Sequence, residues 1–249
     1  MSNRHSPSAL ITGALVAAIL GLGACSIPTT GVRESSTPRA STSDNGTVDV
    51  TAPEESLVAA AVANDAEQVR RLLDAGASAN YRGTDGRPVL VSATRANAVD
   101  AARELIRRGA DVNAKDQISD SAFLYAGAEG LNDILKLTLE NGADVGSTNR
   151  YGGTALIPAC EHAHVETVRL LLDAKVAVDH VNDLGWTCLL EAVILGTGGP
   201  EHQEVVRLVI DAGADVSIAD SDGTTALEHA RRGRQSAVVG LLESAEPPR

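Results

Sequence analysis

Aromatic residues are scarce in this chain: one Trp, three Tyr and one Phe, or 2% of 249 residues. Aromatic side chains normally dominate the energetics of a core, so leucine, valine and alanine must do most of the packing here. That composition is unusual for a β-sandwich or a β-barrel and suits stacked helices. The hydrophobic content of 43% still allows a sizeable core.

An excess of basic residues is also missing, because the formal net charge is −12. Binding to nucleic acid requires a basic face that displaces counterions from phosphates, so we expect no nucleic-acid partner. The negative charge keeps the protein soluble and repels an anionic membrane surface. A basic protein partner fits this balance, although acidic residues also serve simply as a solvated surface.

The sequence contains no apolar run long enough for a membrane span. Residues 9–23 are apolar or small and follow Arg4, but about 20 residues are needed to cross a bilayer. This segment ends in Leu-Gly-Ala-Cys at Cys25, which resembles the bacterial lipobox. The resemblance implies a signal peptide over residues 1–24, cleavage before Cys25 and lipid attachment there, which anchors the chain to the extracytoplasmic face of a membrane. The alternative is an ordinary secretion signal cut near this point, which leaves a free thiol.

Residues 25–53 are rich in Ser, Thr, Pro and Gly and contain almost no large apolar residue. Such a segment cannot bury enough surface to offset its ordering entropy. We therefore expect a flexible tether, a folded domain over residues 54–245 and a disordered tail over 246–249.

Internal repetition defines that domain. One apolar position recurs at intervals of 33, 33, 33, 33 and 38 residues, at Leu57, Leu90, Phe123, Leu156, Leu189 and Leu227. An alanine follows each of them three residues later, at Ala60, Ala93, Ala126, Ala159, Ala192 and Ala230. The chain is therefore predicted to contain six stacked repeats.

Each unit has the same local signals. A turn rich in Asp, Asn and Gly opens it, and a short helix follows, capped by Ser121, Thr154, Thr187 or Thr225. A second helix carries apolar residues with i, i+3, i+4 spacing. A glycine closes that helix in the left-handed region, at Gly76, Gly109, Gly142 and Gly213. Lys175 replaces this glycine in one unit, where a left-handed conformation is strained.

The strings Gly-Gly-Thr-Ala-Leu-Ile-Pro-Ala, which ends at Ala159, and Gly-Ala-Asp-Val-Asn-Ala, which ends at Ala114, resemble the ankyrin repeat. The resemblance covers residues 54–245 and implies an all-α solenoid of about six helix-turn-helix units with β-hairpin-like turns. It also implies a monomer that binds another protein through its hairpin tips and the concave face of its first helices.

One feature remains open at this stage. The unit of 38 residues carries its extra five within Gly196–His202, between its two helices, and this insertion is either tolerated drift or a contact loop.

No catalytic motif is present. Cys160 and His164 share a helix face, as metal ligands can, but the resemblance accounts for both positions. We therefore expect no metal, no cofactor and no enzyme activity. Cys160 and Cys188 are expected to be reduced, because adjacent repeats lie roughly 10 Å apart, beyond the reach of a disulfide.

The resemblance assigns the partner-binding residues by position. On the hairpin tips they are Asp85, Arg87, Gln117, Ile118, Asp120, Arg150, Tyr151, Asp183, Leu184, Trp186, Asp222 and Thr224. On the concave helices they are Arg95, Glu129, Glu161, His162, Ile194 and Leu195. Trp186 is the only tryptophan, and with Tyr151, Leu184, Ile194 and Leu195 expected nearby it has the composition of a binding hot spot. The alternative is that Trp186 packs locally.

These observations predict a membrane-anchored, extracytoplasmic protein-interaction module that acts as a scaffold or as an inhibitor or immunity-type binder. The partner is a protein whose identity the sequence does not contain. The alternative is an envelope binder of a small molecule or ion, which requires a deep pocket with converging polar groups.

Overall fold

The computed structural model describes residues 51–245, and within this range the chain forms twelve helices and no strand. They alternate between an inner and an outer row. The inner helices are α1 (Thr51–Val62), α3 (Val89–Arg95), α5 (Ala122–Ala128), α7 (Leu156–Glu161), α9 (Cys188–Ile194) and α11 (Ala226–Arg232). The outer helices are α2 (Ala66–Asp74), α4 (Val99–Arg107), α6 (Asn132–Glu140), α8 (Val165–Asp173), α10 (Pro200–Asp211) and α12 (Ser236–Ala245).

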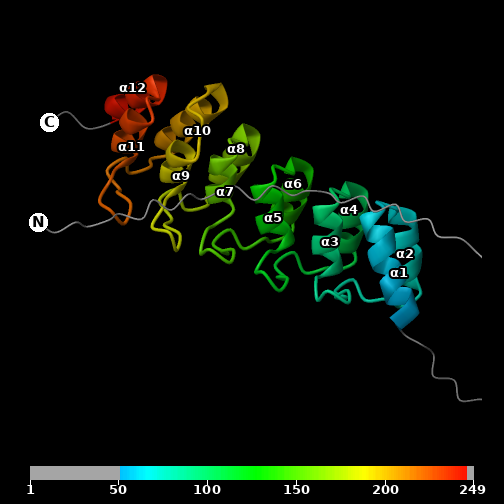
Figure 1. The fold of residues 1–249 in the computed structure, drawn as a ribbon. Helices are drawn as coiled ribbons and strands as arrows, with labels where there is room; N and C mark the ends of the chain where they lie inside the picture. The colour runs from blue at the N-terminus through cyan, green and yellow to red at the C-terminus, as the bar shows by residue number, and fades with distance from the viewer. Residues whose placement is uncertain (1–50, 246–249) are drawn as a thin grey trace, which may run out of the picture. The chain divides into compact units, whose positions relative to one another are not determined.

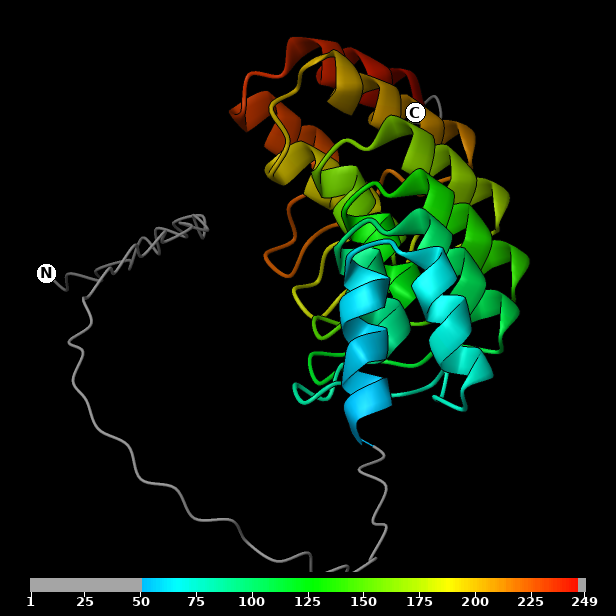
Figure 2. The ribbon, with the colours of Figure 1, turned by 90° about the vertical axis from the view of Figure 1, so that its right-hand side faces the viewer.

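Helix packing follows the order of the chain. Each inner helix packs on the outer helix of its own pair, and each helix packs on its counterpart in the next pair. Figure 1 shows the six pairs side by side, with the loops that precede the inner helices all on one side, and Figure 2 shows the inner and outer rows. Isolated antiparallel bridges occur in two loops, Arg82 with Pro88 and Ala219 with Thr225. The predicted all-α solenoid with hairpin-like turns is confirmed.

The core consists of the recurring apolar positions. The repeated Leu or Phe and the alanine three residues after it are buried in all six repeats. In α8, Val168 and Leu171 are fully buried, as the i, i+3 spacing predicts, while Arg169 on another face of the helix is exposed. Helix pairs that lack large aromatic residues therefore still enclose a continuous core.

Three of the four predicted N-caps are confirmed. The side chains of Ser121, Thr187 and Thr225 each accept a hydrogen bond from a backbone N–H in the first turn of the following helix. The expectation was wrong for Thr154. There Ala155 precedes α7 with helical backbone angles, and the buried Thr154 Oγ1 has no hydrogen-bond partner. The earlier start of the helical backbone removes the extended residue that a side-chain cap requires.

The closing glycines adopt the predicted left-handed conformation. Gly76, Gly109, Gly142 and Gly213 have φ between 83° and 101°. Lys175 has φ 65°, so a residue with a Cβ occupies the same strained region. The backbone therefore keeps this turn even where the sequence departs from glycine.

Neighbouring inner helices approach each other closely where the end of one meets the start of the next. A Cβ at Gly127 in α5 would lie 2.7 Å from the Cβ of Ala155, just before α7. One repeat later, 33 residues on, the same two positions hold Cys160 and Cys188. These two fully buried cysteines form a disulfide with a Cα–Cα distance of 5.5 Å.

The prediction of two reduced cysteines was therefore wrong, for two physical reasons. The spacing of about 8 to 10 Å separates helix axes, and Cα atoms that face each other lie closer by about twice the 2.3 Å helix radius. The facing positions are also 28 residues apart rather than 33, because the end of one helix meets the start of the next. A cross-link over a loop of this length stabilises a fold by about 3 kcal/mol, mainly through the unfolded state.

The five-residue insertion is divided between a helix and a loop. α10 has 12 residues where α4, α6 and α8 have 9, and residues 195–199 connect α9 to α10 where three residues connect α7 to α8. His202 Nε2 lies 3.0 Å from the Glu161 carbonyl oxygen. Gln235 Nε2 donates to the carbonyl oxygens of Val193 and Gly196. The insertion is thus held by the repeats on both sides of it.

The predictions about the signal peptide, Cys25, most of the tether and residues 246–249 lie outside the described residues. Among the helices of residues 51–245, none combines the length and the apolar character that crossing a membrane requires.

The strained Lys175 backbone leads to a stability prediction. Lys175→Gly removes the left-handed penalty, so we expect the free energy of unfolding to rise by about 1 kcal/mol and the melting temperature by roughly 2–4 °C. Thermal unfolding followed by circular dichroism measures this. Gly142 is the matched control, because a Cβ there meets nothing within 4 Å, and Gly142→Ala should lower the melting temperature. An unchanged melting temperature for Lys175→Gly would show that the local backbone carries no such penalty.

Candidate functional site

Four of the five hairpin loops within residues 51–245 share one polar construction. The side chain at their first position, Asp116, Asn149, Asn182 or Asp220, accepts hydrogen bonds through Oδ1 from the backbone N–H groups two and four residues later. In the first hairpin Gly83 takes this position, and Asp85 Oδ1 accepts from the Arg87 N–H instead. In each of these loops the backbone N–H at the first position donates to the carbonyl oxygen of the residue four positions later. These bonds occupy the polar groups inside the loop, and the side chain two residues after the acceptor is left free of the turn.

That free position forms a row along the hairpins. In three consecutive repeats it holds Ile118, Tyr151 and Leu184, at intervals of 33 residues, and their exposed fractions are 44%, 52% and 53%. We call these three residues the tip row. The same position in the flanking repeats holds Asp85 and Asp222, both exposed. Three large apolar side chains that the core does not use are thus flanked by carboxylates.

Neighbouring hairpins are joined by polar contacts, so the tip row has a fixed spacing. Arg82 donates to the Lys115 carbonyl oxygen at 2.8 Å, and Lys115 donates to the Thr148 carbonyl oxygen at 2.7 Å. The Asp183 N–H donates to the Tyr151 carbonyl oxygen at 2.9 Å. A surface held in this way loses little conformational entropy when a partner binds.

The charged residues beside the tip row are mostly engaged within the chain. Arg150 places its guanidinium carbon 4.6 Å from the centre of the Tyr151 ring and its Nη1 3.7 Å from Asp120. Burial, followed by the neighbouring Asp116, raises the pKa of Asp120, and Arg150 opposes this shift. Arg87 pairs with Asp85 at 2.7 Å. Among the described residues no ion pair involves Asp183 or Asp222, so the acidic charge is least compensated at the Leu184 end of the row.

Trp186 lies beside the tip row and is partly buried. It packs against the core, while its backbone N–H donates to Asn182 Oδ1 and its carbonyl oxygen accepts from the Asn182 N–H. The core contacts of Trp186 and its hydrogen bonds to Asn182 are those that the local-packing interpretation predicts. Its role in binding stays a prediction, and Tyr151 and Leu184 offer more exposed surface than Trp186 does.

The predicted residues on the inner helices form a separate group at the other end of those helices. Arg95, Glu161 and Ile194 are the last residues of α3, α7 and α9, and Glu129, His162 and Leu195 follow the ends of α5, α7 and α9. We expected Ile194 and Leu195 near Trp186, but the length of α9, about 10 Å, separates them from it. Leu195 is 48% exposed, and Arg95 lies over the Tyr125 ring at 4.5 Å.

A buried carboxylate, Glu191 in α9, was not singled out from the sequence. It is only 6% exposed, and Asn182 Nδ2 donates to its Oε1 at 2.8 Å. Burial, and secondly the charge of Glu161, raises the pKa of Glu191 to about 7. The equivalent pair one repeat later is Asp220 with His229, at 2.7 Å. The sequence did contain a signal for this pair. In two successive repeats, a polar residue in the hairpin is followed nine residues later by a polar residue in the inner helix.

The sequence pattern also missed the residues that hold the tips, although Asp116, Asn149 and Asn182 recur at intervals of 33 residues. Val181, a further exposed apolar residue with 46% exposure, lies three residues before Leu184 in the same loop.

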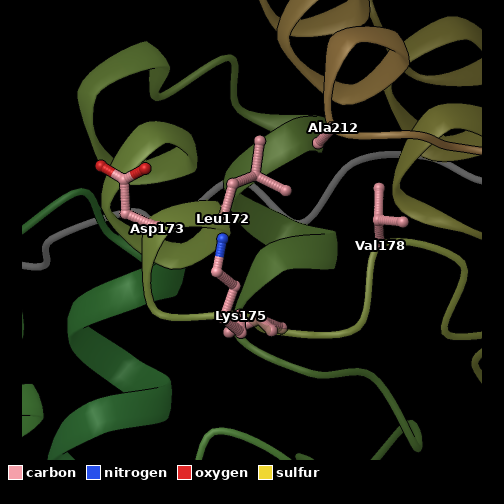
Figure 3. Close-up of a pocket in the computed structure, with 6 residues that line it drawn as sticks. Leu172, Asp173, Lys175, Val178 and Ala212 are labelled. Atoms are coloured by element: carbon pink, nitrogen blue, oxygen red, sulfur yellow. The ribbon is translucent and has the colours of Figure 1, made fainter.

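A shallow groove of about 340 Å³ lies between the ends of α8 and α10 and is lined by Leu172, Lys175, Val178 and Ala212 among others. Figure 3 shows the Lys175 side chain reaching toward Leu172, with the Asp173 carboxylate pointing away from Val178. The groove lacks converging polar groups and is open to solvent. Within residues 51–245 no group of His, Cys, Asp and Glu is arranged to hold a metal ion.

Two family models match the chain. A model of three ankyrin repeats matches residues 123–220, and a single ankyrin-repeat model matches residues 85–117. The search among curated proteins returns no match to the chain.

Two solved structures are similar over most of the described range. An ankyrin repeat domain from Acinetobacter baumannii is 52% identical, with a TM-score of 0.75, and the alignment covers 77% of this chain and 98% of that one. A second ankyrin repeat protein is 39% identical, with a TM-score of 0.73, and the alignment covers 76% and 97% of the two chains.

Glu191 leads to a prediction of pH-dependent stability. Its carboxyl has a pKa near 4.5 when unfolded and about 7 when folded, so the folded chain binds more protons between these values. Stability therefore falls as pH rises through this window. Glu191→Gln should remove this fall and raise the free energy of unfolding near pH 8 by up to about 3 kcal/mol. Urea unfolding across the window measures it.

Glu161→Gln is the control for the second cause of the Glu191 shift, and it should make the fall with pH smaller without abolishing it. Parallel stability curves for the native chain and Glu191→Gln would contradict a buried, proton-binding carboxyl at this position.

Proposed function

Because the chain belongs to the ankyrin-repeat family, whose members are typically non-enzymatic interaction modules, we propose that it is a lipid-anchored, extracytoplasmic module that binds a partner protein through the tip row. The observation that carries the proposal is the exposure of Ile118, Tyr151 and Leu184 at one equivalent position in three consecutive repeats.

The physical argument for binding rests on surface that the fold does not use. Each tip side chain leaves about half of its area in water, although the core is already closed by the inner helices. Full burial of a large apolar side chain contributes roughly 1.5–3 kcal/mol, so covering the exposed half contributes roughly half of that. Aromatic anchors such as Tyr151 and Trp186 are also the residue types most often found at binding hot spots.

The argument for an extracytoplasmic location combines two separate features. The segment ending at Cys25 resembles a lipobox. The buried disulfide between Cys160 and Cys188 is of a kind that persists in oxidising compartments and is rare in the cytosol. Stable anchoring by acyl chains requires two or more of them, as a lipidated and acylated terminal cysteine provides.

Two roles fit a tethered binder of this kind, a scaffold and an inhibitor or immunity-type protein that blocks a partner. Both use the same surface, and they differ in whether the partner's activity falls on binding. The alternative of a small-molecule or ion binder has less support, because the grooves within residues 51–245 are shallow.

Capture of the partner from producing cells tests the binding function. The full chain, carrying an affinity tag, should retain a specific envelope protein that the double variant Tyr151→Ser, Leu184→Ser loses, with affinity reduced at least tenfold. Val62→Ser is the matched control, because Val62 is 48% exposed but lies at the end of α1, away from the row. If the double variant and the native chain capture the same protein equally, the tip row is not the binding surface.

Cell fractionation tests the location. We expect the native chain in the membrane fraction and Cys25→Ala in the soluble extracytoplasmic fraction, because the acyl chains are lost. In both forms, unfolded in denaturant so that the reagent reaches buried positions, Cys160 and Cys188 should resist alkylation until a reductant is added. A Cys25→Ala chain that stays with the membrane, or native cysteines that are alkylated without reduction, would contradict the proposed location.

A further inference from the structure

The spacing of the tip row carries information about the shape of its partner. The three side chains come from adjacent repeats, one from each. Helices that pack in direct contact have axes about 8 to 10 Å apart, and the inner helices of these repeats pack on one another. A partner that contacts all three tips must therefore present apolar groups at intervals of about 9 Å.

A polyproline II segment has this repeat. It has three residues per turn and rises about 3.1 Å per residue, so every third side chain lies on one face at intervals of about 9.3 Å. In a β-strand every second side chain lies on one face, at intervals of about 6.6 Å. This interval does not match the spacing of about 9 Å between the tips. A helix matches only at every seventh residue, about 10.5 Å, and its apolar residues at i+3 and i+4 would find no apolar partner on a single row.

The charges at the two ends of the row differ. Asp85 is paired with Arg87 at 2.7 Å. At the other end, Asp183 and Asp222 are exposed, and neither takes part in an ion pair with another described residue. The Asp183 carboxylate lies against Gly152 in the preceding hairpin, so a cationic group one step beyond the Leu184 contact would meet the carboxylate of Asp222. A second copy of this acidic chain brings no such excess of positive charge.

We propose that the tip row binds an extended polyproline II segment of the partner protein, with apolar residues at every third position and a lysine or arginine at the end that lies over Asp222. This inference rests on the proposed protein-binding function and specifies the partner's chemistry. The segment contacts Ile118, Tyr151 and Leu184 in turn, and its cationic end contacts the carboxylate of Asp222.

Synthetic peptides test the inference directly. The first probe is a fluorescein-labelled, proline-rich peptide with leucine at every third position and two lysines at one end. The second has the same composition with leucine at every second position, and the third is a helix-forming peptide with leucine at every seventh. Fluorescence anisotropy with the full chain in nonionic detergent gives the three dissociation constants.

We expect the first peptide to bind at least tenfold more tightly than the other two, since each additional buried leucine contributes about this factor. Ile118→Ser with Leu184→Ser should remove the difference, and Val62→Ser should keep it. Asp222→Lys should weaken binding of the first peptide severalfold, while Asp85→Lys, at the paired end, should weaken it less.

Equal binding of the first two peptides would overturn the inference, as would tighter binding of the helical peptide or no binding of the first up to about 1 mM. These results leave the proposed function intact if the tip row still captures an envelope protein from cells. Loss of cellular capture, in contrast, would remove the proposed function itself.

Discussion

The close approach of successive inner helices is the constraint on which the rest of this structure depends. At the crossing, Gly127 leaves no room for a Cβ beside Ala155. The same two positions in the next repeat hold two cysteines small enough to bond. Small residues at this contact bring the helices near their minimum separation, which sets the distance from each repeat to the next. The spacing of every feature along the hairpins, including the tip row, follows from it.

The hairpins show how the fold separates structure from recognition. In four of the five hairpin loops a side-chain oxygen, at Asp116, Asn149, Asn182 or Asp220, holds the backbone, so the residue two positions later is not needed for the turn. That residue differs between repeats while the backbone bonds stay the same. A repeat protein can thus change what it binds without changing how it folds.

The sequence predicted the architecture well because the repeat signal is redundant. The buried Leu or Phe, the alanine after it and the closing glycine each recur with one period, and even Lys175 keeps the left-handed turn of the glycine it replaces. Because neighbouring repeats carry the same residue pattern, a single residue that departs from the pattern does not change the backbone.

The predictions that failed concern local geometry and contacts, within a repeat or between repeats, that a periodic alignment does not contain. Cys160 and Cys188 are offset by five residues in the repeat frame, and only the crossing of α7 and α9 brings them together. Ile194 and Leu195 were expected near Trp186, but helix α9 separates them from it. Thr154 occupies a cap position in the alignment, but its local backbone is already helical at Ala155. In each case the start, length or crossing of a short helix determined which groups lie close together.

In a linear stack each repeat is stabilised only by its neighbours, so order is lost by fraying from either end. The disulfide joins the fourth and fifth repeats, and these two repeats carry Tyr151 and Leu184. Fraying that starts at α1 passes three repeats before it reaches the cross-linked pair, and fraying that starts at α12 passes one. Two of the three tip-row residues thus sit in the part of the stack that the cross-link holds together during partial unfolding and limited proteolysis.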